Sequence, residues 1–450
     1  MSQNGQISRR GFLRTAGFAA AGMALAACAA PAGAPSAPAA ETGGEAAPSQ
    51  ENVEVKFHAR IGQQEDALYD MQMPKFMEEN PNITVVKESF PGAEFSAKLA
   101  TMQAGGTLGD VVWSALGGAT IQFAWANNVV APIDDLVASQ DVDLSEWYAG
   151  CIDAITVEGS LLGLPFKAHP GLAVIYLNAT AFEEAGLDLP TADWTVEEQL
   201  DLAIELTESD GERTTQFGYF PSATWKGFVT GTRAWGGELI NEDGTVCLLN
   251  SEEGVAYTNH LYDLFQTHGV APGPEQMLGL ANDMWISGVL SMFQGGTSVA
   301  VTEAAIGDSF EWVALPNAIG PAGVGGSDYE VDAYCVTTTA RDPDASFEWV
   351  KYLCNQESGV QLGLIGGTVG GRPDVYGAEE LLVHPYRVVF KDIMDNAMDS
   401  RITANWRQQE AQVAIEQLMQ PLWAGEAEPT AAFIDEVTAQ LQEIMDRPRP

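Results

Sequence analysis

The alternation of apolar and polar residues after position 52 predicts repeated strand–helix–strand units. Residues 53–57 alternate like a half-buried strand, and residues 68–77 then carry apolar side chains at helical spacing until Asn80-Pro81-Asn82 stops the helix. The unit is repeated by the strand 83–86, the helix 94–104 and the strand 110–113. Because this rhythm is typical of parallel strands joined by crossover helices, we expect an α/β fold.

The pattern predicts further elements downstream of residue 158. Thr195 and Glu198 have the spacing of a capping box and open a predicted helix that runs to about Glu208. Residues 235–249 place Asp243-Gly244 between two runs that can pair, which predicts a hairpin. An apolar strand is expected to end at 299–301. Other strands are expected at 172–177 and 333–337, and other helices at 252–265, 344–354, 413–422 and 431–445.

The first 51 residues follow a different pattern. Arg9 and Arg10 precede an apolar run too short to span a membrane permanently, and small residues then lead to Cys28. We expect residues 1–27 to be a twin-arginine, lipoprotein-type signal peptide that is removed, so that acyl chains on Cys28 anchor the protein to the outer face of the cell membrane or in the periplasm. Residues 28–51 have almost no aliphatic bulk and are expected to form a disordered tether.

Charge narrows the class of partner. Acidic residues outnumber basic ones by 62 to 21, which gives a formal net charge of −41. Nucleic acid is excluded as a partner because binding it relies on neutralising phosphates with Lys and Arg. So large an excess of acidic residues is typical of a salty habitat or of selection for solubility and a cationic ligand, and we favour the habitat because the acidic residues are spread along the chain.

The chain contains no constellation typical of catalysis. It has no nucleophile elbow, phosphate loop or zinc-protease helix, and its five histidines are scattered. Residues 141–145 begin like a calcium loop, but Glu146 and Ile152 stand where that loop needs glycine and glutamate. We therefore expect no enzyme activity, no metal and no cofactor. Buried thiols are expected at Cys151, Cys247, Cys335 and Cys354, whose spacing neither predicts nor excludes a Cys335–Cys354 disulfide.

Tryptophan is the residue type that points to a ligand. The chain has eleven tryptophans, and the candidates for a surface on which a sugar could stack are Trp113, Trp225, Trp235, Trp285 and Trp406. Core packing is the commoner fate of a tryptophan. Trp225 and Trp235 are favoured because both are predicted to lie at the ends of elements, beside glycine.

Several segments together carry a resemblance. Residues 159–166 read GSLLGLPF and are followed by an apolar strand that ends in Tyr176-Leu177-Asn178, then by Phe182 to Leu187 and by Trp194-Thr195. The segments 292–295 and Gly371-Arg372-Pro373 agree with the same pattern. Over residues 52–450 the chain resembles the extracellular sugar-binding proteins of ABC importers, the maltodextrin-binding-protein-like family.

The resemblance implies a two-lobed periplasmic-binding-protein type II fold, with a hinge and a ligand cleft between the lobes. Crossovers are expected near His169, Asp332 and Tyr376. The implied boundaries are residues 52–168 and 332–375 for lobe I, and 169–331 and 376–450 for lobe II. The residues expected to line the cleft are Gln63, Trp113, Phe166, His169, Trp225, Trp235, Glu303, Tyr329, Asp332 and Arg372.

The implied function is that of a monomeric receptor, which binds an oligosaccharide or a glycoside between its lobes and delivers it to an ABC permease in the membrane. Two alternatives stay open. A receptor for a polyamine or another cationic solute would combine carboxylates with aromatic walls in its cleft. An extracellular carbohydrate-active enzyme would turn over the glycan that it binds.

Overall fold

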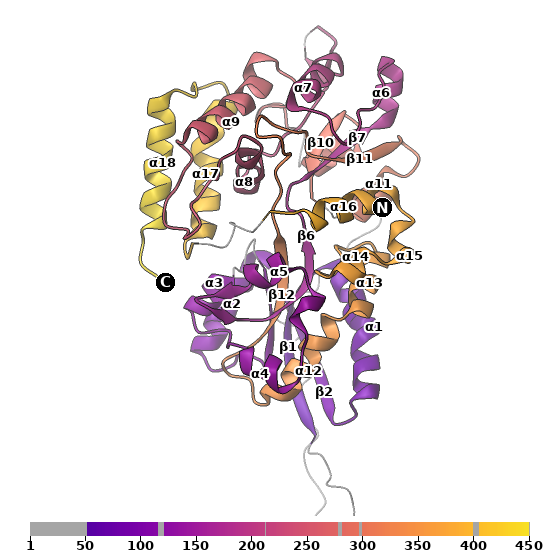
Figure 1. The fold of residues 1–450 in the computed structure, drawn as a ribbon, viewed down its shortest axis with the longest axis vertical. Coiled ribbons are helices and arrows are strands. Elements are labelled where there is room, and N and C mark those ends of the chain that lie inside the picture. Colours follow the sequence, from indigo (N-terminus) through magenta and orange to yellow (C-terminus); the bar gives the residue numbers. More distant parts are fainter. Residues whose placement is uncertain are drawn as a thin grey trace, which may run out of the picture. The chain divides into compact units, whose positions relative to one another are not determined.

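The described part of the chain combines α-helices with β-strands. The computed structural model describes residues 52–449 apart from 116–120, 212, 278–280, 297–298 and 399–404. The predicted signal with Arg9, Arg10 and Cys28, and the predicted tether, lie outside the described residues. The expected two-lobed α/β fold is confirmed, with one β-sheet in each lobe (Figure 1). Among the described helices none is long and apolar enough to cross a membrane.

Lobe I is built on a five-stranded sheet of order β2-β1-β3-β12-β6. Its strands are β1 (Val53–Arg60), β2 (Ile83–Phe90), β3 (Val111–Ala115), β6 (Leu164–His169) and β12 (Glu330–Val336). β1 pairs in parallel with β2 and β3, as the strand–helix–strand rhythm predicts, whereas β12 runs antiparallel to both β3 and β6. The helices of this part of the chain are α1 (Gln63–Glu79), α2 (Phe95–Ala104), α3 (Ile121–Ala126), α4 (Asp134–Ser139), α5 (Ala149–Ala154), α12 (Pro343–Leu353), α13 (Gln356–Leu364) and α14 (Pro373–Tyr376).

Lobe II is built on a three-stranded antiparallel sheet of order β10-β7-β11. Its strands are β7 (Val174–Asn178), β10 (Met292–Gly295) and β11 (Trp312–Pro316). The helices that follow β7 are α6 (Ala179–Ala185), α7 (Val196–Glu205), α8 (Trp225–Ala234), α9 (Glu252–Tyr262), α10 (Ala281–Ile286) and α11 (Val299–Ile306), and later α15 (Glu379–Leu382), α16 (Pro385–Asp395), α17 (Gln408–Trp423) and α18 (Ala431–Met445). Two small hairpins pair β4 (Thr156–Val157) with β5 (Ser160–Leu161) and β8 (Glu208–Ser209) with β9 (Thr214–Gln216).

Of the local predictions, one is confirmed, one is wrong and one is confirmed only in part. Thr195 Oγ1 accepts a hydrogen bond from the Glu198 N–H at 3.2 Å, and Glu198 Oε2 accepts one from the Thr195 N–H at 2.7 Å. The capping box is therefore confirmed. The apolar run at 299–301 is not a strand but begins α11, because a short apolar run has no periodicity that separates a strand from a helix. The predicted hairpin over 235–249 is reduced to a single bridge between Ile240 and Cys247.

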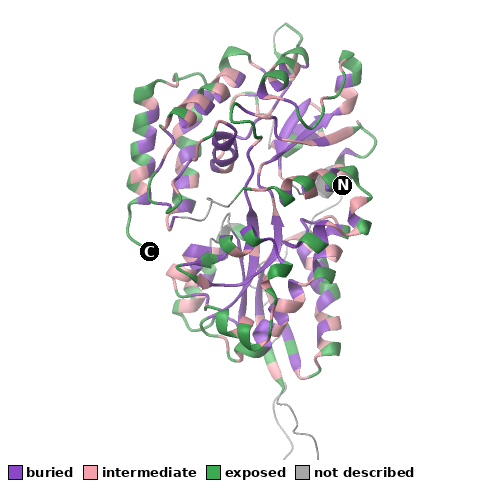
Figure 2. Cartoon of the chain, in the orientation of Figure 1, coloured by how far each residue is buried: buried purple, intermediate pink, exposed green. Residues whose placement is uncertain are grey.

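The core of lobe I is an aromatic cluster that joins distant parts of the chain. Phe57 of β1 lies edge-on to Tyr334 of β12 at a ring distance of 5.1 Å, and Phe166 of β6 lies 4.8 Å from the same ring. Tyr69 of α1 and Trp349 of α12 also contact Phe57 edge-on. Such pairs add about 0.5–1.5 kcal/mol each beyond the area that they bury. In Figure 2 the central strands of this lobe are coloured as buried.

The chain crosses between the lobes at two points that need glycine. It leaves the large sheet after His169 and returns to it with Glu330. Gly171 and Gly326 both have φ of +69° at these crossings, and a Cβ on Gly326 would lie 1.9 Å from the Thr230 carbonyl oxygen. The four lobe boundaries given above, and a third crossing near Tyr376, stay predictions.

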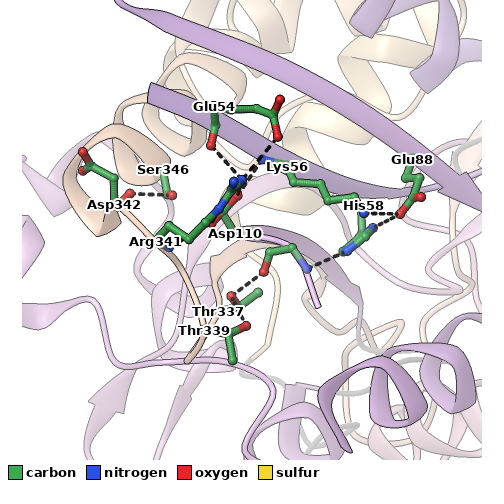
Figure 3. A network of polar contacts seen from close by, with 11 residues as sticks. Glu54, Lys56, His58, Glu88, Asp110, Thr337, Thr339, Arg341, Asp342 and Ser346 are labelled. Atoms are coloured by element: carbon green, nitrogen blue, oxygen red, sulfur yellow. Dashed lines mark hydrogen bonds and ion pairs between the residues drawn. The ribbon is translucent and has the colours of Figure 1, made fainter. Parts of the chain in front are cut away.

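A polar network ties β1, β3 and β12 together where β3 begins and β12 ends (Figure 3). Arg341 Nη2 lies 2.8 Å from Asp110 Oδ2, and the Lys56 N–H donates to the same carboxylate at 2.7 Å. Thr337 Oγ1 donates to the Gly109 carbonyl oxygen at 2.6 Å. These bonds hold the ends of strands that are more than 200 residues apart in the chain.

His58 is the histidine buried in this network, beside the buried carboxylate of Asp110. Its Nε2 accepts the Gly109 N–H at 2.8 Å, so a neutral ring carries its proton on Nδ1, which lies 3.3 Å from Glu88 Oε2. Burial lowers the pKa of His58 to about 4, and the Glu88 carboxylate opposes this only in part. Protonating Nε2 would remove the acceptor for Gly109.

We predict an acid-sensitive contribution of His58 to stability. An unfolded histidine titrates near pH 6.5, so between pH 6.5 and 4 the unfolded chain binds more protons than the folded one and stability falls as the pH is lowered. The thermal midpoint of residues 50–450 should therefore fall more steeply over this range than that of the His58→Asn variant, whose amide oxygen can accept from Gly109 at any pH. The exposed His268→Asn change is the matched control. Parallel pH profiles for wild type and His58→Asn would contradict the prediction.

Candidate functional site

Side chains from four strands converge at one edge of the lobe I sheet. β1, β3 and β6 end there, while the antiparallel strand β12 begins there. The register places Asp332 of β12 opposite both Ala115 of β3 and Lys167 of β6, and it places Glu330 opposite His169. In open α/β sheets ligands bind outside the carboxyl ends of the strands, so this edge is the candidate functional site.

A half-buried cluster of four charges occupies this edge. Lys167 Nζ contacts both Glu65 Oε1 and Asp332 Oδ2, the latter at 3.1 Å. Arg60, at the end of β1, donates to Glu65 Oε1 from Nη2 at 3.0 Å. Two cations thus face two carboxylates, and the 10 % exposure of the Lys167 and Glu65 side chains leaves each dependent on its partner.

The pairing keeps Glu65 ionised. Burial alone would raise the pKa of this carboxyl group, but the Lys167 ammonium and the Arg60 guanidinium outweigh it and lower the pKa to about 2. Glu65 is therefore a fixed negative charge at neutral pH and not an acid that can give up a proton.

Trp113 of β3, which is only 4 % exposed, links this charged cluster to the aromatic core. Its Nε1 donates to Asp332 Oδ2 at 3.2 Å, and the Arg60 guanidinium carbon lies 4.7 Å from the centre of its ring. Phe95 of α2 packs edge-on against it at 5.1 Å. Trp113 is thus held in one orientation beside the charges.

A second charged group lies where β12 enters the sheet. Glu330 Oε2 contacts His169 Nε2 at 3.2 Å and accepts from Lys226 Nζ at 2.5 Å. Burial would raise the pKa of Glu330, but Lys226 and His169 hold it well below its usual range. Because Lys226 belongs to α8 of lobe II and Glu330 to β12 of lobe I, this ion pair joins the two lobes at their crossing.

The structure brings three of the predicted site residues to this edge. Trp113, Asp332 and His169 take part in the contacts above. Gln63 is the first residue of α1, close in sequence to Glu65, and its side chain lies outside the described residues. Tyr329 immediately precedes β12, but its hydroxyl donates to the Met394 carbonyl oxygen at 3.1 Å.

The other predicted residues lie elsewhere. Phe166 and Trp225 are each only 1 % exposed, so packing accounts for them. Trp235 ends α8 and packs on Tyr257 and His260, with ring distances of 5.2 and 4.8 Å. Glu303 of α11 accepts from the Tyr386 hydroxyl.

Arg372 is also engaged away from the cluster. Its guanidinium pairs with Glu146 at 2.7 Å and with Asp374 at 2.8 Å, and it lies 4.9 Å from the Trp147 ring centre. It is thereby committed to holding the segments around residues 146 and 373 together.

Sequence reasoning missed most of the charged residues of the site. Arg60, Glu65, Lys167, Lys226 and Glu330 were not among the predicted residues. Carboxylates are too frequent in so acidic a chain for any one to stand out. The usable signal was position for Arg60, which follows the predicted strand 53–57, whereas Lys167 lies in no strand that the pattern predicts.

Within the described residues, neither the cavities nor the possible metal ligands point to a second functional site. A cavity of about 550 Å³ on lobe II is lined by residues of the β11–β12 connection and of α16, and no residue of the charged cluster lines it. Within the described residues no group of three or more His, Cys, Asp or Glu side chains could hold a metal ion. The four cysteines after residue 51 are free and buried, as expected for structural thiols.

Comparison with solved structures supports the fold. An ABC substrate-binding protein from Listeria monocytogenes in complex with cycloalternan is 20 % identical with a TM-score of 0.75, and the match covers 88 % of this chain and 99 % of that one. The GacH receptor of Streptomyces glaucescens, solved unliganded and with acarbose, is 20 % identical with a TM-score of 0.74 over 88 % and 98 %. Maltose-bound MalE3 of T. maritima is 18 % identical with a TM-score of 0.69 over 87 % and 100 %.

Sequence comparison identifies the family. Curated protein sequences gave no match. Residues 61–359, about two thirds of the chain, match the family described as bacterial extracellular solute-binding protein. This range includes every residue of the charged cluster except Arg60. The chain therefore belongs to the bacterial extracellular solute-binding proteins.

Proposed function

We propose that this protein binds a neutral carbohydrate, an oligosaccharide or a glycoside, between its lobes and delivers it to an ABC permease without altering it. The observation that carries the proposal is the internal charge balance of the site. In a chain with a net charge of −41, the four charges at the sheet edge sum to zero, two cations against two carboxylates.

Charge balance favours a ligand without net charge. Paired Lys, Arg, Asp and Glu side chains keep further donors and acceptors that can bond to hydroxyl groups, so they can bind a sugar without losing their partners. Trp113 is only 4 % exposed, and its indole N–H donates to Asp332, so it orients that carboxylate toward the site from the core side. Several similar structures were solved with sugars, among them maltose, mannotriose and tagatose.

The same pairing argues against the two alternatives. A polyamine receptor needs carboxylates that are free to meet ammonium groups, whereas Glu65, Asp332 and Glu330 are each already paired with a cation of the chain. A glycosidase needs a carboxylic acid that stays protonated near neutral pH. The pKa of Glu65 is lowered to about 2, and that of Glu330 is held below its usual range, so neither can serve as this acid.

Delivery and anchoring complete the proposal. We infer that export through the segment with Arg9 and Arg10, followed by acylation of Cys28, holds the receptor at the outer face of the membrane. The tether 28–51 then lets a monomeric receptor reach its permease. Ligand-driven closure would follow from a higher affinity of the closed state for the sugar, because both lobes can contact the sugar only when they have moved together.

We predict that binding is selective for neutral sugars and nearly independent of salt. Calorimetric titration of residues 50–450 with maltotriose, mannotriose and spermidine should give heat with a sugar and none with spermidine. The sugar Kd should change less than about threefold between 0.05 and 0.5 M NaCl, because screening acts on charge pairs and not on a neutral ligand. Chromatography should return the bound sugar intact. Binding of spermidine alone, or a cleaved sugar, would contradict the proposal.

We predict that replacing Lys167 destabilises the protein, because the site depends on this cation to compensate two carboxylates. Lys167→Met removes the cation that Glu65 and Asp332 share. The free energy of unfolding measured in urea should therefore fall by about 3–5 kcal/mol. Adding Glu65→Gln should recover part of this loss. The control Lys75→Met removes an exposed pair with Glu357 and should lower the free energy of unfolding much less than Lys167→Met does. Equal losses of unfolding free energy in the two lysine variants would contradict the prediction, because the cluster would then contribute no more to stability than a surface ion pair.

A further inference from the structure

A short segment after α18 is fixed to lobe II by several polar contacts. Arg407, at the start of α17, donates to the Pro448 carbonyl oxygen from Nη2 at 2.6 Å and from Nε at 3.1 Å. Arg447 Nη1 pairs with Glu410 Oε2 at 2.7 Å. Residues 446–449 are thereby held against the helix pair α17–α18 and have a defined course.

From this anchored segment Arg449 reaches lobe I. Its guanidinium carbon lies 4.4 Å from the centre of the Trp406 ring of lobe II. Its Nη1 lies 3.5 Å from Glu158 Oε2, in the β4–β5 turn, and its Nη2 donates to the Trp125 carbonyl oxygen of α3 at 3.5 Å. Trp125 Nε1 donates to the same Glu158 carboxylate at 2.8 Å, so the two lobe I partners are already joined.

The backbone at Glu158 is a second, independent observation. Glu158 and Gly159 form the two-residue loop between β4 and β5, and both have positive φ, 52° and 81°. Such loops favour Asn or Gly at the first position, because a residue with a Cβ is disfavoured at positive φ. A glutamate kept at this position aims a carboxylate at Arg449 at some cost in backbone energy, and strain of this kind is typical of functional positions.

We propose that Arg449 acts as a salt-sensitive strap between the lobes: its contacts with Glu158 and Trp125 favour the arrangement in which the lobes approach each other, and releasing it lets them separate. The contact lies away from the charged cluster and involves none of its residues. It therefore adjusts the balance between lobe arrangements and not the chemistry of ligand recognition. The inference goes beyond the proposed function, because it requires no ligand and holds whichever solute the protein binds.

The expected size of the effect is modest. Both ion-pair partners are about half exposed, with side-chain exposures of 42 % for Arg449 and 54 % for Glu158. Exposed pairs of this kind shift a two-state equilibrium by about two- to fivefold, and the shift weakens as salt rises. A fivefold change in the population of one lobe arrangement is large enough to resolve in single molecules.

Single-molecule energy transfer in the ligand-free protein tests the strap. Cysteines introduced at the exposed positions Ala138 of α4 and Ala439 of α18 carry the dyes, and the cysteines of residues 50–450 do not compete because all are buried. In 0.05 M NaCl, Arg449→Ala should lower the high-transfer population about two- to fivefold, and 0.5 M NaCl should bring wild type close to the variant. Arg213→Ala, which removes an exposed arginine within lobe II, is the control.

Two further variants separate a strap from a merely local role. Glu158→Gly removes the partner of Arg449 and also the strain of a non-glycine residue at positive φ. It should therefore open the lobes without lowering the thermal midpoint, so misfolding cannot explain its effect. The charge swap Glu158→Arg with Arg449→Glu should restore the high-transfer population. Unchanged distributions in Arg449→Ala would overturn the proposal, as would a loss that the swap does not reverse. Neither outcome bears on sugar binding, which is measured separately by titration.

Discussion

The structure depends on the need to compensate charges that are withdrawn from water at the edge of the lobe I sheet. Lys167 is nearly buried between Glu65 and Asp332, and each of the three would be costly to bury alone. These three residues come from three separate parts of the chain, so the cluster forms only when β12 has paired with β6 in the observed register. The aromatic layer beneath, centred on Tyr334 of the same strand, depends on the same pairing. Register, core and site are therefore set together.

The connection between the lobes follows from where β12 begins. Because the chain returns from lobe II directly into the site, Glu330 lies at the crossing and can pair with Lys226 of α8. The glycines at both crossings let the backbone pass close to its neighbours in a conformation that other residues rarely adopt. In the function that we propose, ligand recognition and lobe movement share residues, whereas the proposed strap at Arg449 lies outside the site and would act on the movement alone.

The contrast between the whole chain and its site is informative. A net charge of −41 keeps the surface strongly acidic, yet the carboxylates at the sheet edge are matched by Lys and Arg from neighbouring strands. Net charge governs solubility and long-range attraction, while selection of a ligand depends on the groups left unpaired where it binds. Overall acidity is therefore a poor guide to the ligand, and the local pairing is the better one.

Local periodicity was enough to determine β1 and α18, and the Thr195–Glu198 capping box could be predicted because its partners are three residues apart. The family could be identified from short segments for the same reason. Tertiary structure alone decided which aromatic residues are core and which charges meet: Lys167 and Glu65 are 102 residues apart, and no pattern along the chain links them. Burial and pairing are properties of the folded register, so a sequence that specifies each strand does not reveal them until the strands are side by side.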